Sequence, residues 1–355
     1  DEIEHPPVEC VFTTEEEVGL NGAKALDKSV LKARTMINMD SEDEGVATVS
    51  CAGGLRVQFT KEIQRTTVQG SLLTLKVEGL LGGHSGQDID KERQNADLLM
   101  ARMIQRLLKE TKGQLVSFNG GTKDNAIPRE CEASLIYESD EEAAKAEELA
   151  CELAETYAEE LTPAEPDFSC EISCETNRTA EAIPQDAAKE FICAMRLAPN
   201  GIQKRNIKMD GFVVVSLNLG VVRTEEDRIV MIFSPRSSVA SLQEDTKERL
   251  NTLAETFGFT VSHSSEYPGW SFKEDSPVRE ICKESYKELF GEDLKIEAIH
   301  AGLECGLFSD AIKGLDAIAI GPTIANCHTP DEYLTLDSFE RFYEFLKDIL
   351  SRLAK

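Results

Sequence analysis

The sequence has 355 residues, and its 38 Lys and Arg residues are outnumbered by 65 Asp and Glu residues, which gives a formal net charge of −27. That charge argues against a nucleic-acid-binding protein, because neutralising phosphates requires a surplus of Lys and Arg, and it argues equally against docking on anionic membranes. The length exceeds the roughly 250–300 residues that a single hydrophobic core usually fills, so we expect two domains.

Secretion and membrane insertion find no support in the sequence. No stretch approaches the roughly 18–20 apolar residues that a membrane span requires, and residues 1–7 are acidic and polar, unlike a signal peptide. The 10 cysteines are scattered, and the closest pair, Cys170 and Cys174, lacks the two-residue spacing of a zinc knuckle. We therefore expect free thiols and a cytoplasmic protein.

The chain begins and ends with elements typical of an α/β sheet. Short apolar and β-branched runs predict strands at 8–14 and 35–39, separated by a loop at 15–21 and a helix at 22–33. The same alternation returns near the end of the chain, with predicted helices at 277–290, 306–313 and 337–354 and predicted strands at 295–299 and 316–320.

The middle of the chain contains two successive blocks with the same order of elements: strand, helix, strand, strand, helix. Their predicted ranges are 71–78, 89–110, 114–118, 131–138 and 140–160 in the first block, and 168–176, 184–197, 213–222, 228–234 and 238–257 in the second. Two such blocks side by side would form one extended sheet with helices on one face. The sequence thus predicts an α/β domain of residues 1–54 and 267–355, interrupted by an inserted α+β domain of residues 55–266 made of two similar halves.

Carboxylates follow both strands predicted in the N-terminal part. Glu15, Glu16 and Glu17 come directly after the first of these strands, and Asp40 comes directly after the second. In open α/β sheets, ligands bind beyond the carboxyl ends of the strands. Acidic runs are usually solvated loops, but clustering carboxylates at neighbouring strand ends is costly unless a cation lies between them.

His328 lies in the loop after the last predicted strand, in the sequence NCHTPDE at 326–332. A histidine alone in a loop is usually structural or solvated. Together with Glu17 and Asp40 it becomes a candidate zinc ligand, because catalytic zinc sites use His and carboxylate ligands and keep one position open for water.

His84 is surrounded by glycines, in the sequence LLGGHSG at 80–86. Glycines allow the backbone to approach a ligand closely, which favours a histidine that is presented to that ligand. The same sequence also fits a tight turn before the helix predicted from residue 89, with Ser85 or Asp88 as its cap.

The sequence around His84 resembles the lid signature of the aminoacyl-histidine dipeptidases, which belong to the di-zinc aminopeptidase and carboxypeptidase superfamily that includes carnosinase. Other segments match that family in the same order: TEEEVGLNGA at 14–23, NMDSEDEG at 38–45, NAIP at 125–128, HAGLECG at 300–306, and GPTI at 321–324 followed by HTPDE at 328–332. These ordered motifs cover essentially the whole chain. The resemblance implies a catalytic α/β domain, here residues 1–54 and 267–355, interrupted by a lid and dimerisation domain, here residues 55–266.

The resemblance also implies roles for individual residues. Glu16 is the expected general base, which takes a proton from the attacking water and passes it to the leaving amine. Glu17 and His328 are the expected ligands of one metal ion, and Asp40 is an expected ligand of the other. His84 is expected to reach the oxyanion of the tetrahedral intermediate, in relatives usually from the lid of the partner subunit.

Three further residues are implied to contact the substrate: Asn125 and Arg236 from the lid, and Glu304 from the catalytic domain. The implied cofactors are two divalent metal ions, with zinc as the first expectation and cobalt or manganese as alternatives. Such ions lower the pKa of bound water towards about 7 and hold the carbonyl oxygen. A histidine donor at the oxyanion adds about 3–4 kcal/mol of transition-state stabilisation, and a lid excludes water during the reaction.

One part of the family pattern is absent. Relatives carry a His-x-Asp motif and a metal-bridging Asp before the Glu-Glu pair, whereas only residues 1–14 precede that run here, and His5 has no Asp two residues later. We therefore expect the chain to lack an N-terminal segment of the family, as a cleaved or truncated chain, a gene fragment, or one of two chains that share the site. The metal site of this chain alone would then be incomplete and its activity low.

The sequence therefore predicts a metal-dependent dipeptidase that hydrolyses short peptides, of the Xaa-His type, as a homodimer through the lid. Two alternatives remain open at this point. One is another exopeptidase or deacylase of the same superfamily, such as an aminotripeptidase. The other is a non-catalytic binding or oligomerisation module, which the missing ligands would favour.

Overall fold

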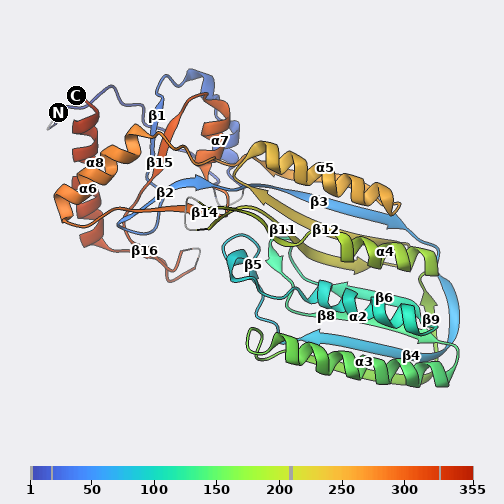
Figure 1. The fold of residues 1–355 in the computed structure, drawn as a ribbon. Helices are drawn as coiled ribbons and strands as arrows, with labels where there is room; N and C mark the ends of the chain where they lie inside the picture. Colours follow the sequence, from blue (N-terminus) through green and yellow to red (C-terminus); the bar gives the residue numbers. More distant parts are fainter. Residues whose placement is uncertain (1–2, 17–18, 208–210, 328, 355) are drawn as a thin grey trace. The chain divides into compact units, whose positions relative to one another are not determined.

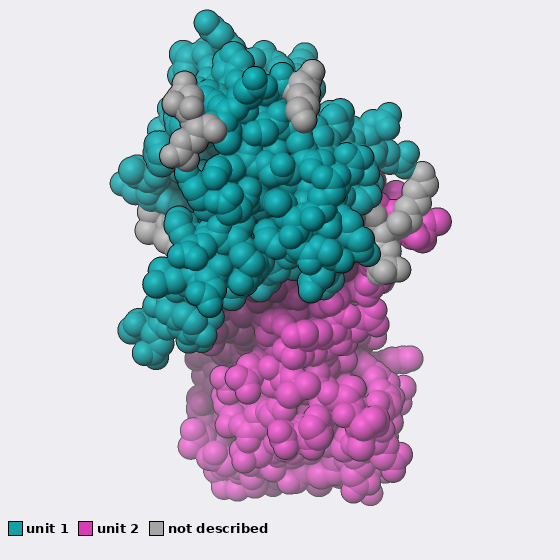
Figure 2. All heavy atoms as spheres, turned by 90° about the vertical axis from the view of Figure 1, so that its left-hand side faces the viewer, with its two compact units in different colours: residues 1–53, 237–240, 267–355 teal, residues 54–236, 241–266 magenta. Residues whose placement is uncertain are grey.

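The computed structural model describes residues 3–16, 19–207, 211–327 and 329–354. Its contacts divide the chain into two compact units, which Figure 2 colours teal and magenta. Unit 1 consists of residues 1–53, 237–240 and 267–355, and unit 2 consists of residues 54–236 and 241–266. The short segment 237–240, which the sequence assigned to the inserted domain, groups with unit 1.

Unit 1 contains a four-stranded mixed sheet within the described residues. Its strands, in spatial order, are β1 (Thr35–Asn38), β15 (Asp316–Ala319), β2 (Val46–Cys51) and β14 (Lys295–Ile299). β1 and β15 run parallel, with Thr35 opposite Asp316 and Asn38 opposite Ala319, whereas β15 and β2 run antiparallel. The carboxyl ends of β1 and β15 therefore lie at the same edge of the sheet. A separate short hairpin joins β16 (Ile324–Ala325) to β17 (Tyr333–Leu334).

Helices accompany this sheet where the C-terminal sequence predicted them. They are α6 (Pro277–Phe290), α7 (Glu304–Ala311) and α8 (Leu336–Leu353). The Ser276 side chain accepts a hydrogen bond from the backbone N–H of Arg279 and so caps the start of α6. The helix ends at Gly291, whose positive φ of 75° ends the helical geometry without a steric cost. α6 packs against α8 through the rings of Tyr286 and Phe345, whose centroids are 5.3 Å apart.

The N-terminal prediction was wrong in two places. Residues 8–14 form neither helix nor strand, and Val8 and Phe12 expose 50 % and 91 % of their side chains. A β-rich composition forms a strand only where a partner strand supplies hydrogen bonds and a packed face. The helix predicted at 22–33 is also interrupted. It consists of α1 (Asn21–Ala25) and a 3₁₀ turn, η1 (Lys28–Val30), because the Asp27 side chain accepts from Ser29 N and starts a new turn.

Unit 2 is built on a nine-stranded sheet in the part of the chain that the structure describes. Eight strands form one path, in the order β13 (Thr260–Tyr267), β3 (Gly53–Glu62), β12 (Arg228–Ser237), β11 (Phe212–Thr224), β6 (Gln114–Gly120), β8 (Cys131–Tyr137), β4 (Thr66–Glu78) and β9 (Ser169–Ala182). The ninth, β10 (Gly201–Asn206), pairs with β11.

The two blocks seen in the sequence lie in one extended sheet, as expected. The first block forms the triplet β4, β8, β6. β9 of the second block pairs antiparallel with β4 at the edge of the sheet, and β3 lies next to β12. β4 and β9 can pair along most of their length, from Thr66 opposite Ala182 to Glu78 opposite Ser169.

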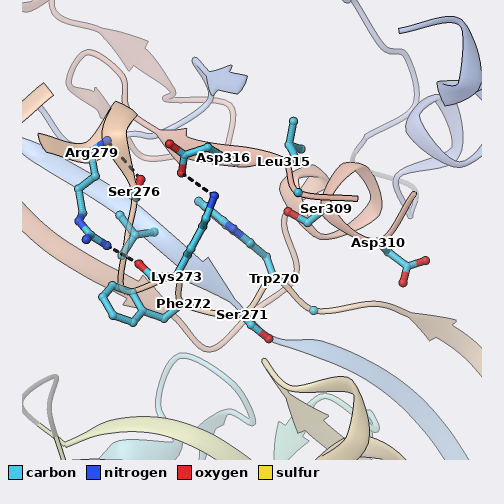
Figure 3. Close-up of a pocket in the computed structure, with 14 residues that line it drawn as sticks. Trp270, Ser271, Phe272, Lys273, Ser276, Arg279, Ser309, Asp310, Leu315 and Asp316 are labelled. Atoms are coloured by element: carbon cyan, nitrogen blue, oxygen red, sulfur yellow. Dashed lines mark hydrogen bonds and ion pairs between the residues drawn. The ribbon is translucent and has the colours of Figure 1, made fainter. Parts of the chain in front are cut away.

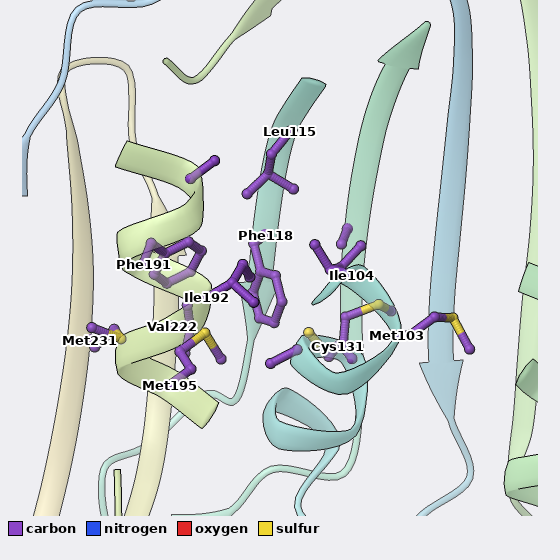
Figure 4. Packing of buried hydrophobic residues seen from close by; sticks show 14 of the residues in the cluster. Met103, Ile104, Leu115, Phe118, Cys131, Phe191, Ile192, Met195, Val222 and Met231 are labelled. Carbon is purple, nitrogen blue, oxygen red and sulfur yellow. The ribbon is translucent and has the colours of Figure 1, made fainter. Parts of the chain in front are cut away.

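Four helices cover one face of this sheet, and Figure 1 shows them side by side. They are α2 (Ala96–Glu110), α3 (Asp140–Leu161), α4 (Gln185–Leu197) and α5 (Ala240–Thr256). Their apolar faces share one core with the strands, and Figure 4 shows its centre, where Phe118 of β6 meets Phe191 of α4 edge to face at 5.4 Å. No described helix is both long and apolar enough to cross a membrane.

Candidate functional site

The loop after β1 holds Asp40 at the carboxyl end of the strand. The Asn38 side chain accepts from the backbone N–H of Asp40 at 2.9 Å, which fixes the turn, and the Asp40 side chain is exposed. The same loop lies against residues 321–324. A Cβ on Gly321 would come within 1.8 Å of the Ser41 carbonyl oxygen, and Ile324 N donates to Glu42 O at 2.9 Å. Only glycine therefore permits this approach at position 321.

Two other predicted residues of unit 1, Glu16 and Glu304, lie on segments joined by a side-chain hydrogen bond. Glu304 is the first residue of α7, and its Oε1 accepts from Thr13 Oγ at 2.7 Å, three residues before Glu16. Glu16 begins a turn in which its carbonyl oxygen accepts from Gly19 N and Leu20 N.

The buried Cys305 follows Glu304 at the start of α7. Burial raises the pKa of its thiol well above the usual value, and the charges of Cys51, Glu304 and Asp40 raise it further.

The predicted metal ligands can be examined only in part, because Glu17 and His328 lie outside the described residues. Among the residues that are described, no group of three or more His, Cys, Asp and Glu side chains could hold a metal ion. Asp40 offers an exposed carboxylate at a strand end, and the Cys327 thiol, next to position 328, lies against the carboxylate of Glu42. Carboxylate and imidazole donors fit the ligand chemistry of zinc.

His84 is held with one ring nitrogen engaged. It lies in the short strand β5 (Gly83–His84), which pairs with β7 (Ala126–Ile127). Its Nδ1 accepts from Gly86 N at 3.3 Å and from Gln87 N at 3.0 Å. A nitrogen that accepts carries no proton, so the neutral ring carries its proton on Nε2. Burial lowers the pKa of His84, and the positive charge of Arg236 lowers it further, which favours this neutral form.

Asn125 and Arg236 belong to the same region of unit 2. Ser85 N donates to Asn125 O at 2.9 Å, so the residue after His84 is tied to the loop before β7. Arg236 lies near the end of β12, buried to 6 % exposure, and acts electrostatically on His84. The structure thus ties the His84 loop directly to the Asn125 segment.

A cavity of unit 1 lies elsewhere on its sheet. It has a volume of about 380 Å³, and its lining includes Trp270, Lys273, Arg279 and Asp316. Asp316 begins β15, whereas Asp40 follows the carboxyl end of the parallel strand β1, so the cavity lies towards the opposite end of these strands. Figure 3 shows two interactions within its lining: Lys273 Nζ lies 3.7 Å from Asp316, and Arg279 donates to the Lys273 carbonyl oxygen. No predicted site residue lines it.

Comparison with known proteins relates the whole chain to peptidases. Residues 1–352 match the profile of Peptidase family M20/M25/M40. The cytosol non-specific dipeptidase of Escherichia coli (strain K12) is 33 % identical over 357 residues, which cover 99 % of this chain and 72 % of that protein. The crystal structure of aminoacylhistidine dipeptidase from Vibrio alginolyticus superposes with a TM-score of 0.94 at 34 % identity, covering 99 % of this chain and 72 % of that one.

The chain belongs to the M20/M25/M40 family of peptidases. The resemblance seen in the sequence is thereby confirmed, as are the α/β fold class and the assignment as a metallopeptidase that acts on peptides. The roles of the individual site residues stay predictions.

In this M20 peptidase, sequence reasoning missed three buried polar residues of unit 2: Asp97, Glu165 and Asn218, exposed to 0 %, 2 % and 1 %. Asn218 was the most visible of them, because it is an amide within the apolar run of β11. Asp97 looked like an ordinary acidic residue in the first turn of a helix. Glu165, between two prolines in an acidic segment, looked solvated.

Proposed function

We propose that this protein is a dipeptidase that prefers Xaa-His peptides. Both well-matched relatives bear the name dipeptidase, and the one of known structure is an aminoacylhistidine dipeptidase. The Escherichia coli relative is called non-specific, so a dipeptidase without preference for histidine is the second candidate.

The observation that carries the proposal is the state of His84. Its Nδ1 accepts two backbone N–H groups, so Nε2–H remains to donate to an oxygen that becomes negative in the transition state. Amide hydrolysis builds negative charge on this oxygen, and a donor placed there stabilises the transition state. Such a preorganised donor, next to a residue that is bonded to the Asn125 backbone, favours a catalytic site over a passive binding module.

Unit 1 supplies the remaining residues of the proposed site. Glu16 acts as the base that accepts a proton from the attacking water and returns it to the leaving amine. Glu17 and His328 bind one divalent metal ion, and Asp40 binds a second. When bound, such ions supply water that ionises near neutral pH and a Lewis acid for the carbonyl. Zinc is proposed first, with cobalt or manganese as alternatives.

Substrate contacts are proposed for Asn125, Arg236 and Glu304. Arg236 offers a fixed cation for a peptide carboxylate, which a dipeptidase must recognise close to the scissile bond. We further propose a homodimer that forms through the lid domain, residues 55–266, and a cytoplasmic location. The dimer is implied by the resemblance stated above, whereas the location is supported by the expectation of free thiols and by the Escherichia coli relative, which is named a cytosol dipeptidase.

The test is a substrate panel with the purified protein and added zinc, cobalt or manganese: Gly-His, Gly-Leu, the tripeptide Gly-Gly-His, and N-acetyl-histidine. We expect the highest kcat/KM for Gly-His and no turnover of the acyl amino acid. Equal values for Gly-His and Gly-Leu would favour the non-specific dipeptidase. Preference for the tripeptide or the acyl amino acid would contradict the proposal.

A second measurement separates an enzyme from a binding module. Glu16→Gln removes the proposed base and keeps the size of the side chain. We expect it to abolish turnover of Gly-His while leaving peptide binding, measured by calorimetry, nearly unchanged.

A further inference from the structure

The loop that carries His84 depends on contacts from outside itself. It runs from β4 to α2 and contains only the short strand β5 and a 3₁₀ turn, η2 (Ile89–Lys91). Within the loop, His84 N donates to Asp88 Oδ2 at 2.8 Å. That bond sets the local turn, but it does not fix where the loop lies on unit 2. The middle of the loop is held by the pairing of β5 with β7 and by the bond from Ser85 N to Asn125 O. The position of the His84 ring depends in addition on how the two ends of the loop are held.

Both ends of this loop are bound by a single side chain, that of Glu165. Its Oε2 accepts from Leu81 N at 2.7 Å, just before the glycines, and its Oε1 accepts from Gln94 N at 2.8 Å, just before α2. Glu165 lies 84 and 71 residues away from these two partners along the chain and is only 2 % exposed. One buried carboxylate thus joins the entry and the exit of the loop.

The segment that carries Glu165 is itself well anchored. Its backbone N–H donates to Leu161 O at the end of α3, and its carbonyl oxygen accepts from Phe168 N just before β9. Two residues further on, Asp167 O lies so close to Gly79 that a Cβ there would come within 1.9 Å. Glu165 therefore reaches the loop from a rigid turn between two regular elements.

We propose that Glu165 is the positioning residue of His84: it holds the two ends of the loop together so that the imidazole is presented to the substrate. This inference rests on the role of His84 in the proposed function. The chemistry explains the residue type, because two parallel N–H donors require two acceptors, and an ionised carboxylate offers both. A glutamine would accept from one N–H and turn its own NH₂ group towards the other.

The test compares three substitutions with a matched control. Glu165→Gln keeps the size of the side chain and loses one acceptor, Glu165→Ala loses both, and Glu165→Asp is the mildest change because it only shortens the side chain. The control is Thr111→Val, at the far end of α2, which removes a buried hydroxyl bonded to Leu107 O and to the hydroxyl of Tyr137. This change destabilises unit 2 without touching the His84 loop.

We expect Glu165→Gln and Glu165→Ala to lower kcat about tenfold to a hundredfold, as misplacement of a catalytic group typically does, with KM changed less than about twofold. Thr111→Val should leave kcat within about twofold. In a His84→Ala background the Glu165 substitutions should lower kcat no further, because their effect passes through His84. Hydrogen exchange should rise at Leu81, at Gln94 and in the loop between them, and not in the control variant.

Each result decides a different question. Unchanged kcat in the Glu165 variants, with His84→Ala still damaging, would overturn the positioning role. Losses that persist undiminished in the His84→Ala background would show a general structural effect and would also overturn it. If His84→Ala itself leaves kcat unchanged, the proposed function has the wrong donor, while the exchange data still report whether Glu165 holds the loop.

Discussion

His84 makes the most direct prediction at the scale of single residues. Replacing it by alanine removes one donor to the proposed oxyanion, so we expect kcat to fall by about 10²–10³ with little change in KM. His263→Ala is a matched control in the same unit, because that ring is exposed on the surface, where its Nε2 lies 3.0 Å from Asn251 Oδ1. Equal kinetics for the two variants would remove His84 from the mechanism.

The pH dependence of activity offers a second view of the same ring. Since burial and Arg236 lower the pKa of His84, the neutral imidazole persists throughout the neutral range. Protonation at acidic pH would place a proton on Nδ1, facing the N–H groups of Gly86 and Gln87 that it now accepts from. His84 therefore contributes activity that is lost as pH falls and is constant above about pH 7.

Asp97 is the residue whose protonation should affect stability most. It is fully buried in the first turn of α2, and a Cβ on Gly120 would come within 1.6 Å of its Oδ1. Burial raises its pKa to about 8, against the smaller opposing effects of Cys131 and Arg223. Between about pH 4 and pH 8 the folded chain therefore binds a proton that the unfolded chain has released, so stability falls as pH rises across this range.

Asp97→Asn should remove that dependence, because the amide has nearly the same shape and does not ionise. We expect the stability of the variant relative to the parent to increase with pH, by up to about 1.4 kcal/mol per pH unit between pH 5 and pH 7. The free energy of unfolding of both proteins is measured with urea at pH 5, 6 and 7. Amide exchange in α2 at the same pH values gives a second measurement. Parallel curves for the two proteins would contradict a protonated Asp97.

At the scale of elements, β11 carries a side chain that supports the Asn125 segment. Asn218 donates through Nδ2 to Ala126 O at 2.8 Å and to Asp124 O at 3.4 Å, on either side of Asn125. The next residues of β11 leave no room for displacement, since a Cβ on Gly220 would come within 2.4 Å of Asp124 O. β11 thus holds the backbone on both sides of Asn125, the proposed substrate-binding residue.

Asn218→Asp tests whether β11 positions Asn125, because the aspartate keeps the shape of the side chain and loses the donor. We expect KM for a dipeptide to rise about tenfold, the equivalent of about 1.4 kcal/mol, with a smaller change in kcat. Asn200→Asp is the matched control, since Asn200 only accepts, from Leu219 N at 3.0 Å, and an aspartate can do the same. A similar KM in both variants would show that β11 does not position Asn125.

The elements themselves show what a sequence can and cannot predict. β4 alternates buried and half-buried positions, and α2 carries Leu99, Met103 and Leu107 on one face, so local periodicity revealed both. The partner of β9 could not be predicted, because pairing depends on which distant edge strand is open, and that information is not local. The strand predicted at 8–14 fails for a related reason: its composition is β-rich, but none of the described strands pairs with it.

The candidate site also contains residues that local sequence indicates and residues that it does not. His84 and Asn125 could be found because their motifs are contiguous and glycine-rich or adjacent to proline. Glu165 and Asn218 could not, since each acts through backbone groups that lie 84 and 92 residues away. A side chain that binds a distant backbone leaves no pattern in its own neighbourhood.

At the scale of the whole molecule, the proposed machinery is shared between the two units. Glu16, Glu17, Asp40, Glu304 and His328 belong to unit 1, whereas His84, Asn125 and Arg236 belong to unit 2. Every proposed metal ligand therefore lies in one unit. Metal binding can then be detected as stabilisation of that unit, without measuring activity. An ion that binds only the folded state stabilises what it binds, by about 2.7 kcal/mol at 100 times its dissociation constant.

Removal of metal should thus affect the two units unequally. We expect a chelator to abolish peptide hydrolysis and to raise hydrogen exchange around β1 and α7 of unit 1, while protection in the α2–α4 core of unit 2 stays unchanged. Zinc should restore both properties, and cobalt or manganese should be tested beside it. Asp40→Asn should weaken the stabilisation by zinc, whereas Asp310→Asn, an exposed carboxylate on α7, should not. Equal loss of protection in both units, or zinc stabilisation that survives in Asp40→Asn, would contradict the assignment of the metal ions to the strand ends of unit 1.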